Sequence, residues 1–371
     1  FGDGGREAAE LMRFAALDGL QDQLVDATDH GGGQRGRQRA FAGLDGDVVA
    51  HSWVSFGGSL FSKPIILPSN LSPLGALPSR FRKPRLLVVG GGDVAQRMAK
   101  DLAGRWRMMV LVRRPEQAAH WRKLGGVPLQ GDLDQPATLR RLAGLAHRVI
   151  HLAPPPTSGQ SDPRSQHLVQ ALSLRTPPAS LVYASTTGVY GDARGDVVRE
   201  TRSLNPMSDR AVRRVHAEQQ LRRWGKRAAV AVSVFRIPGI HAPDREGSLR
   251  DRLLRLAPVL VPQDDVHTNH IHADDLARIL HWALWGAGPQ RCYNVNDETR
   301  LPMGEALTQL AQHLGLAPPP RLTWAQAKDS LSPMVLSFWR ESRQVDATRL
   351  TSEWPWRLRY PRLVDAYSPQ A

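Results

Sequence analysis

The chain has 371 residues, 41% of them hydrophobic and 23% charged, which is enough for one large α/β domain or two smaller ones. Its formal net charge is +14, but the arginines that carry it are scattered, without zinc-finger spacing or the aromatic–basic alternation of RNA-binding sheets, so we predict no nucleic-acid partner. The single cysteine, Cys292, excludes an intrachain disulfide and a thiolate metal cluster and fits a reducing cytoplasm, and no apolar run reaches the ~18 residues of a membrane span.

The first 83 residues differ from the rest of the chain. They hold nine basic and nine acidic side chains, so the positive surplus lies beyond them. Glycine clusters and four prolines interrupt the segment, and no sustained hydrophobic period crosses it. We interpret residues 1–83 as a disordered or artefactual extension, with an interaction or targeting tail as the alternative.

A short apolar run, 85–89, leads into Gly90-Gly91-Gly92 and then into a helical pattern. The spacing Gly90-x-Gly92-x-x-Ala95 fits the dinucleotide-binding fingerprint with alanine in the third place. Gly90 is expected to make the turn, and Gly92 to let a pyrophosphate approach the backbone at the helix N-terminus. The alternative is a glycine-rich loop without a ligand.

The second predicted strand, 108–112, is followed by Arg113 and Arg114. An NAD site places Asp or Glu near this position to hold the ribose 2′-hydroxyl. Guanidinium groups instead suit a 2′-phosphate. The sequence therefore favours NADP(H) over NAD(H), with ordinary solvated loop arginines as the alternative.

From Pro84 onward, strand and helix patterns alternate, which predicts a Rossmann-type α/β fold with a doubly wound parallel sheet. We predict a dinucleotide-binding domain over 84–240 and a smaller, irregular C-terminal substrate-side part over 241–371. The expected strands are 85–89, 108–112, 127–130, 148–153, 180–184, 230–236 and 291–295; the expected helices are 93–104, 115–124, 136–145, 162–174, 207–224, 273–285 and 303–314.

Several segments together resemble a known family. The matching stretches are 90–95, 131–134, 151–154, 183–192, 217–218, 235–240, 270–277 and 293–297. In order and spacing they resemble the extended short-chain dehydrogenases/reductases, the NAD(P)-dependent epimerase/dehydratase proteins, and more narrowly an atypical subgroup with a short G-x-G-D-V loop. The resemblance covers residues 84 to about 363.

The resemblance implies where a dinucleotide would bind. Asp132 and Leu133 would flank the adenine, although Asp132 can equally be a turn residue after a strand. Ala153 and Pro154 would pass beside the ribose and nicotinamide, and Arg236, Pro238 and Gly239 would lie under the nicotinamide. The cofactor-binding set is thus Gly90, Gly92, Asp93, Val94, Ala95, Arg113, Arg114, Asp132, Leu133, Ala153, Pro154, Arg236, Pro238 and Gly239.

The chain departs from this family at the catalytic positions. The family uses a Tyr-x-x-x-Lys pair, whereas the corresponding positions here hold Arg210 and Arg214. Arginine keeps its proton at ordinary pH, so Arg210 is no general acid or base. Ser185 and Tyr190 remain as candidate catalytic residues. His270 and His272 precede a helix with Asp274 and Asp275, but this His/Asp cluster lacks a recognisable metal-ligand spacing. We therefore expect no metal.

Two functions remain open at this point. The first is an NAD(P)(H)-binding protein with a degenerate catalytic pair, serving as a cofactor sensor or scaffold. The alternative is an NADP-dependent oxidoreductase or epimerase that acts on a hydroxyl or carbonyl compound, such as a nucleotide sugar, with a replacement acid/base. We expect an unidentified small-molecule ligand and no membrane partner, and leave a homodimer open.

Overall fold

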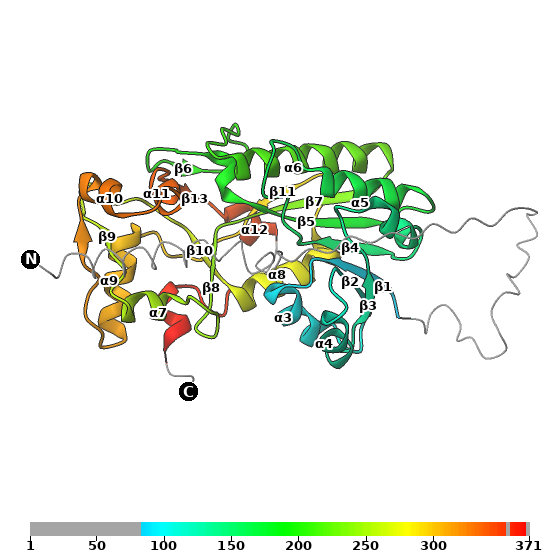
Figure 1. Cartoon of the computed structure of the whole chain (residues 1–371), viewed down its shortest axis with the longest axis horizontal. Coiled ribbons are helices and arrows are strands. Elements are labelled where there is room, and N and C mark those ends of the chain that lie inside the picture. The colour runs from blue at the N-terminus through cyan, green and yellow to red at the C-terminus, as the bar shows by residue number, and fades with distance from the viewer. Residues whose placement is uncertain (1–82, 354–356, 369–371) are drawn as a thin grey trace, which may run out of the picture. The chain divides into compact units, whose positions relative to one another are not determined.

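The structure is a computed structural model, and it describes residues 83–353 and 357–368 (Figure 1). A sheet of seven parallel strands has the order β11-β7-β5-β4-β1-β2-β3. Its strands are β1 (Arg85–Val89), β2 (Arg107–Val112), β3 (Val127–Gln130), β4 (Arg148–His151), β5 (Ser180–Thr186), β7 (Ala231–Ile237) and β11 (Cys292–Asn294). The chain progresses outward in one direction from β1 and in the other from β4, so the predicted doubly wound α/β fold is confirmed.

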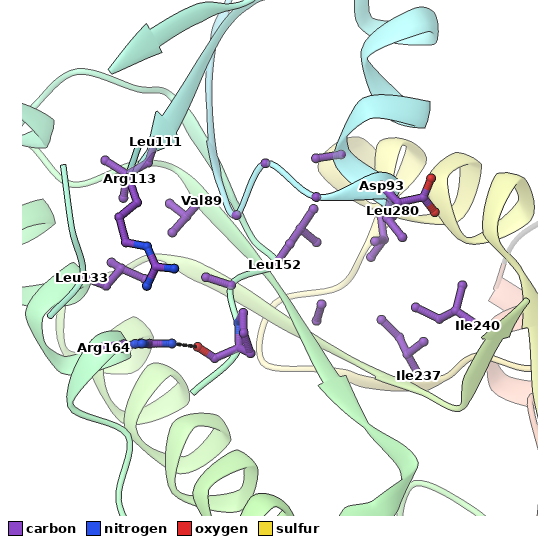
Figure 2. Close-up of a pocket in the computed structure, with 18 of the residues that line it drawn as sticks. Val89, Asp93, Leu111, Arg113, Leu133, Leu152, Arg164, Ile237, Ile240 and Leu280 are labelled. Carbon is purple, nitrogen blue, oxygen red and sulfur yellow. Dashed lines mark hydrogen bonds between the residues drawn. The ribbon is translucent and has the colours of Figure 1, made fainter. Parts of the chain in front are cut away.

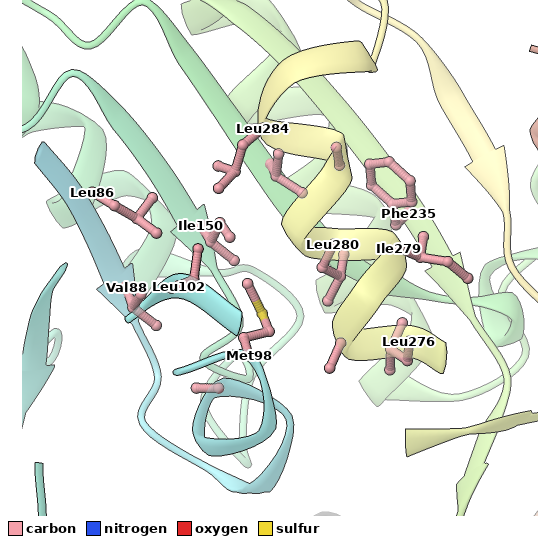
Figure 3. Packing of buried hydrophobic residues seen from close by; sticks show 14 of the residues in the cluster. Leu86, Val88, Met98, Leu102, Ile150, Phe235, Leu276, Ile279, Leu280 and Leu284 are labelled. Atoms are coloured by element: carbon pink, nitrogen blue, oxygen red, sulfur yellow. The ribbon is translucent and has the colours of Figure 1, made fainter. Parts of the chain in front are cut away.

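Helices cover both faces of this sheet. One face carries α3 (Asp93–Leu102), α4 (Gln117–Lys123) and α8 (Ala273–Gly286), and the other carries the 3₁₀ helix η2 (Pro136–Leu142), α5 (Pro163–Ser173) and α6 (Asp209–Arg227). Strand side chains alternate between the two faces: Leu86 and Val88 pack toward α3 and α8, whereas Leu87 and Val89 pack toward the opposite layer (Figure 3). The segment predicted as a helix over 136–145 is thus a shorter 3₁₀ helix.

The domain boundary expected at residue 240 does not separate two packed units, because elements on both sides of it belong to the same sheet and helix layers. Helix α8 and strand β11 follow residue 240 in the sequence, yet α8 packs on α3 and β11 pairs with β7. Burial of Leu276, Leu280 and Leu284 of α8 against the sheet explains this return (Figure 3). Of the predicted extension, only Lys83 lies within the described residues.

The remaining elements build the part of the chain beyond the sheet. Three short parallel pairs join β6 (Val197–Val198) to β13 (Gln344–Val345), β8 (Gly239–His241) to β10 (His270–His272), and β9 (Val259–Leu260) to β12 (Arg321–Leu322). The helices are α7 (Leu249–Leu254), α9 (Met303–His313), α10 (Trp324–Ser330), α11 (Pro333–Trp339) and α12 (Thr348–Glu353), with 3₁₀ turns η3 (Thr187–Tyr190) and η4 (Leu363–Tyr367). The sequence pattern missed most of these because strands of two or three residues and helices of about two turns are too short to show a sustained period.

Candidate functional site

The glycine loop between β1 and α3 has the conformation that its sequence predicts. Gly90 has φ +101°, and a Cβ there would lie 2.6 Å from the backbone nitrogen of Ala153 at the end of β4. Gly91 is also constrained, because its Cβ would lie 2.7 Å from the Trp121 indole nitrogen, a contact that sequence reasoning did not find. Gly92 begins α3, and a Cβ there would meet nothing within 4 Å. The helix N-terminus therefore borders open space, as an anion site requires.

A first cavity of about 350 Å³ lies beyond the carboxyl ends of the central strands, beside this loop (Figure 2). Its lining includes most of the predicted cofactor residues and Ser185: Gly90, Gly92, Asp93, Val94, Ala95, Arg113, Arg114, Asp132, Leu133, Ala153, Pro154, Ser185 and Pro238. Ligands of open α/β sheets bind at this place, where the strand order reverses. The tertiary fold thus gathers residues that are separated by almost 150 positions in the chain.

One end of the first cavity carries arginines from two elements. Arg113 and Arg114 follow β2 and are exposed. Arg164 of α5, which sequence reasoning missed, also lines the cavity; it donates to Asp134 Oδ2 at 2.6 Å and to the Pro154 carbonyl at 3.2 Å (Figure 2). Hydrogen bonds from Arg164 lower the pKa of Asp134, so this carboxylate stays charged. The pair fixes the loop after β4 against the loop after β3.

Asp132 takes part in the turn that sequence reasoning offered as the alternative to adenine binding. Its Oδ1 accepts a hydrogen bond from the Asp134 backbone N–H at 2.9 Å, which is an Asx turn. The residue still lines the first cavity, so the turn and a contact with a ligand are compatible. Asp93, at the start of α3, accepts from Arg97 at 2.9 Å and lies 3.5 Å from Arg245.

Arg210 and Arg214 of α6, which we expected at the catalytic positions, both line cavities at this site. Arg214 donates to the Ala184 carbonyl at 2.7 Å and to the Tyr183 hydroxyl at 3.3 Å. The Arg210 guanidinium lies 4.6 Å from the ring centre of Phe338 on α11. Both arginine side chains thus have contacts within the protein beside the cavities.

Ser185 reaches the first cavity from the end of β5, but its hydroxyl already has a buried partner. The Oγ donates to Glu218 Oε1 at 2.5 Å, and Arg236 binds the other carboxylate oxygen at 2.8 Å. The side chains of Arg236 and Glu218 are only 4% and 3% exposed. Removing one partner of such a buried pair would leave an uncompensated charge and destabilise the fold, so we assign this cluster a structural role.

The structure does not support two expectations, that Arg236 binds the cofactor and that Tyr190 is catalytic. Neither lines either cavity described here, and Tyr190 is buried, with its hydroxyl donating to Asn294 at 2.7 Å and accepting from Arg236 at 2.9 Å. Burial raises the pKa of Tyr190 to about 12, which does not suit a proton donor at neutral pH. Because side chains alternate along β7, Arg236 points toward Glu218 while its neighbour Ile237 lines the first cavity.

A second cavity, of about 270 Å³, adjoins the first. The residues that line both cavities are Thr186, Arg214, Pro238, Ile240 and Arg245. Gly239, predicted beside the nicotinamide, lines the second cavity alone, as do His241 and His270. The strand pair β8–β10 thus brings together two histidines that sequence reasoning could place only separately.

These histidines form a buried group with His272. The ring centres of His241 and His272 are 5.4 Å apart, and those of His241 and His270 are 6.2 Å apart. Burial lowers the pKa of each of the three to about 4, so they are neutral at pH 7. Over residues 83–353 and 357–368, no three or more His, Cys, Asp or Glu side chains are arranged to hold a metal ion.

Comparison with known proteins identifies the family. Residues 86–295 match the model of the NAD dependent epimerase/dehydratase family, and this chain belongs to that family. A functionally unknown conserved protein from Silicibacter pomeroyi DSS is 28% identical with a TM-score of 0.64, covering 76% of this chain and 96% of that one. The UDP-glucose 4-epimerase of Thermus thermophilus in complex with NAD, 21% identical with a TM-score of 0.58, covers 76% and 98% and shares the fold.

Among curated proteins, Protein YeeZ of Escherichia coli K12 is 25% identical over 198 residues, 53% of this chain and 64% of its own length. The match thus spans less than two thirds of that relative. Within the described part of the chain, no helix combines the length and apolar character needed to cross a membrane.

The buried histidines predict a loss of stability in acid. A histidine whose pKa is about 4 when folded and about 6.5 when unfolded contributes stability above pH 6.5, and this is lost as the pH falls toward 4. Asp297, whose pKa burial raises to about 6, has the opposite effect and offsets part of the loss. We expect the melting temperature to fall by several degrees between pH 7 and 4.5 in calorimetry.

Between pH 7 and 4.5 the melting temperature of the variant His270→Gln should fall less than that of the native chain, whatever its value at pH 7. The control is His120→Gln, because His120 is exposed and should leave the slope unchanged. If the melting temperature falls equally steeply with pH in all three proteins, the buried histidines are not the cause of the loss of stability in acid.

Proposed function

We propose that this protein binds NADP(H) in the first cavity. The observation that carries the proposal is the glycine loop: Gly92 opens onto the cavity at the N-terminus of α3, and Gly90 lets the loop approach the end of β4. The backbone N–H groups of the first turn of α3 would hold the pyrophosphate. The lining also includes the guanidinium groups of Arg113 and Arg114, and these donors fit a phosphate-bearing cofactor.

Arg113 and Arg114 support the preference for NADP(H). A 2′-phosphate carries a charge that two guanidinium groups bind and that a carboxylate would repel. The Arg113 side chain is directed toward the cavity near Leu111 and Leu133 (Figure 2). When bound, the cofactor would supply or accept hydride; the chain's own residues orient it and exclude water.

The function that we favour is cofactor binding without the family's usual proton transfer, as in a sensor of NADP(H) or a scaffold that responds to it. The support is the pair Arg210 and Arg214, which face the site and stay protonated. The second candidate is an NADP-dependent oxidoreductase or epimerase acting on a hydroxyl or carbonyl compound. The second cavity favours it, because a site for another ligand adjoins the proposed nicotinamide end.

Cofactor choice can be tested by titration. NADPH should bind more tightly than NADH, and the double variant Arg113→Asp/Arg114→Ala should remove most of the difference. Charge-assisted hydrogen bonds contribute about 1.5–3 kcal/mol, so we expect NADPH to bind roughly ten- to hundredfold more tightly than NADH. Arg140→Asp/Arg141→Ala is the matched control, since this exposed pair on η2 lines neither cavity. Equal affinity of the native chain for both dinucleotides would refute the NADP preference.

The loop glycines give a paired test of fold and binding. Gly90→Ala should lower stability by about 1–3 kcal/mol, because alanine disfavours positive φ and its Cβ would collide with Ala153. Gly92→Ala should leave the melting temperature of the free protein nearly unchanged but weaken NADPH binding, since its methyl group would project into the space proposed for the pyrophosphate. Unchanged NADPH affinity in Gly92→Ala would contradict the placement.

Catalysis gives the third test. Without a positioned acid or base, about 10²–10⁴-fold of rate enhancement is missing. The native chain saturated with NADPH or NADP⁺ should therefore show little or no turnover of common dehydrogenase substrates in an absorbance assay at 340 nm. Arg210→Tyr/Arg214→Lys together should raise any residual rate. Robust turnover by the native chain would favour the enzyme candidate over the sensor.

A further inference from the structure

The lining of the second cavity is strongly basic. Five arginines from different elements line it: Arg210 and Arg214 of α6, Arg245, Arg252 of α7, and Arg343. All five are partly buried. Only two lining residues are acidic, Glu246 and Glu341, which leaves an excess of three positive charges (five minus two).

The excess of three positive charges already counts both carboxylates of the lining. Glu341 is committed to Arg343, whose Nη1 lies 2.6 Å from its Oε2, and Glu246 is exposed. Arg245 lies 3.5 Å from Asp93, which belongs to the first cavity. Several partly desolvated guanidinium groups around one cavity are stabilised by an anion placed among them.

The same cavity has neutral polar side chains on its β8–β10 side. Both ring nitrogens of His241, Nδ1 of His270 and the Thr268 hydroxyl are buried and have no hydrogen-bond partner among the described residues. The Asp297 carboxylate oxygen Oδ2 lies 3.8 Å from His241 Nε2, too far for a hydrogen bond. Unsatisfied buried groups are costly, so their presence beside a cavity indicates a ligand with hydroxyl groups.

Size limits the ligand further. A cavity of about 270 Å³ is smaller than the ~300–1,000 Å³ of ordinary ligand pockets. The lining combines charge with a short apolar wall that includes Phe338 and Trp339 of α11. These dimensions suit a small molecule.

We propose that the second cavity binds a small hydroxylated phosphate monoester, such as a sugar phosphate. The phosphate would be held by Arg210 and Arg252, which line this cavity alone, and the hydroxyl groups would face His241 and Thr268. The proposal rests on the proposed function, because the ligand would meet the cofactor at the shared residues Pro238 and Ile240. It narrows the ligand from hydroxyl or carbonyl compounds in general to small phosphorylated ones.

The test is calorimetric titration of the full chain with D-ribose 5-phosphate, first without and then with saturating NADPH. D-ribose 5-phosphate should bind in both cases and D-ribose should not. Arg252→Gln and Arg210→Gln should each weaken its binding about tenfold or more, because each loses a charge-assisted contact, while NADPH affinity stays unchanged. Arg250→Gln is the matched control, since Arg250 is an exposed residue of the same helix as Arg252 and lines neither cavity.

The proposal would be overturned by no binding of D-ribose 5-phosphate, by binding that both arginine variants leave unchanged, or by tighter binding of UDP-glucose than of the probe. Loss of probe binding in Arg113→Asp/Arg114→Ala, but not in Arg252→Gln, would place the phosphate in the first cavity and also refute it. Failure of NADPH to bind would refute the proposed function alone, since the titration without NADPH still tests the second cavity. Circular dichroism and melting curves establish that each variant is folded.

Discussion

The site depends on one close backbone approach, that of Gly90 to Ala153. A Cβ at Gly90 would lie 2.6 Å from the Ala153 nitrogen, so the loops after β1 and β4 meet only because glycine stands there. Between these two strands the chain direction across the sheet reverses, and the first cavity lies beyond their carboxyl ends. The placement of α3, and with it the open N-terminus at Gly92, follows from that approach.

A second set of interactions joins the helices and strands around the site through buried or partly buried ion pairs. The buried carboxylate of Glu218 binds Arg236 and accepts the Ser185 hydroxyl, which joins β5, α6 and β7. On the other side, Arg97 of α3 binds Asp274 of α8 at 2.6 Å and Asp244 at 2.7 Å. Both clusters hold charged side chains against specific partners within the protein.

The glycine loop and two arginines of α6 lie at neighbouring cavities of this member of the family. Arg210 and Arg214 both line the second cavity, and Arg210 packs against Phe338 of α11. The second cavity beside them remains open and basic. The two cavities share lining residues, so ligands bound in both would lie next to each other.

The sequence by itself determined the alternating strands and helices of the sheet, the glycine loop, and the arginines after β2, because each depends on a local period or on a residue that only one backbone conformation accepts. Only the tertiary structure decided that Arg236 and Tyr190 bind each other away from the cavities, and that Arg164, His241 and Arg252 line them. Which side of a strand faces a ligand, and which distant loops meet, depend on packing between elements whose separation in the chain exceeds any sequence period.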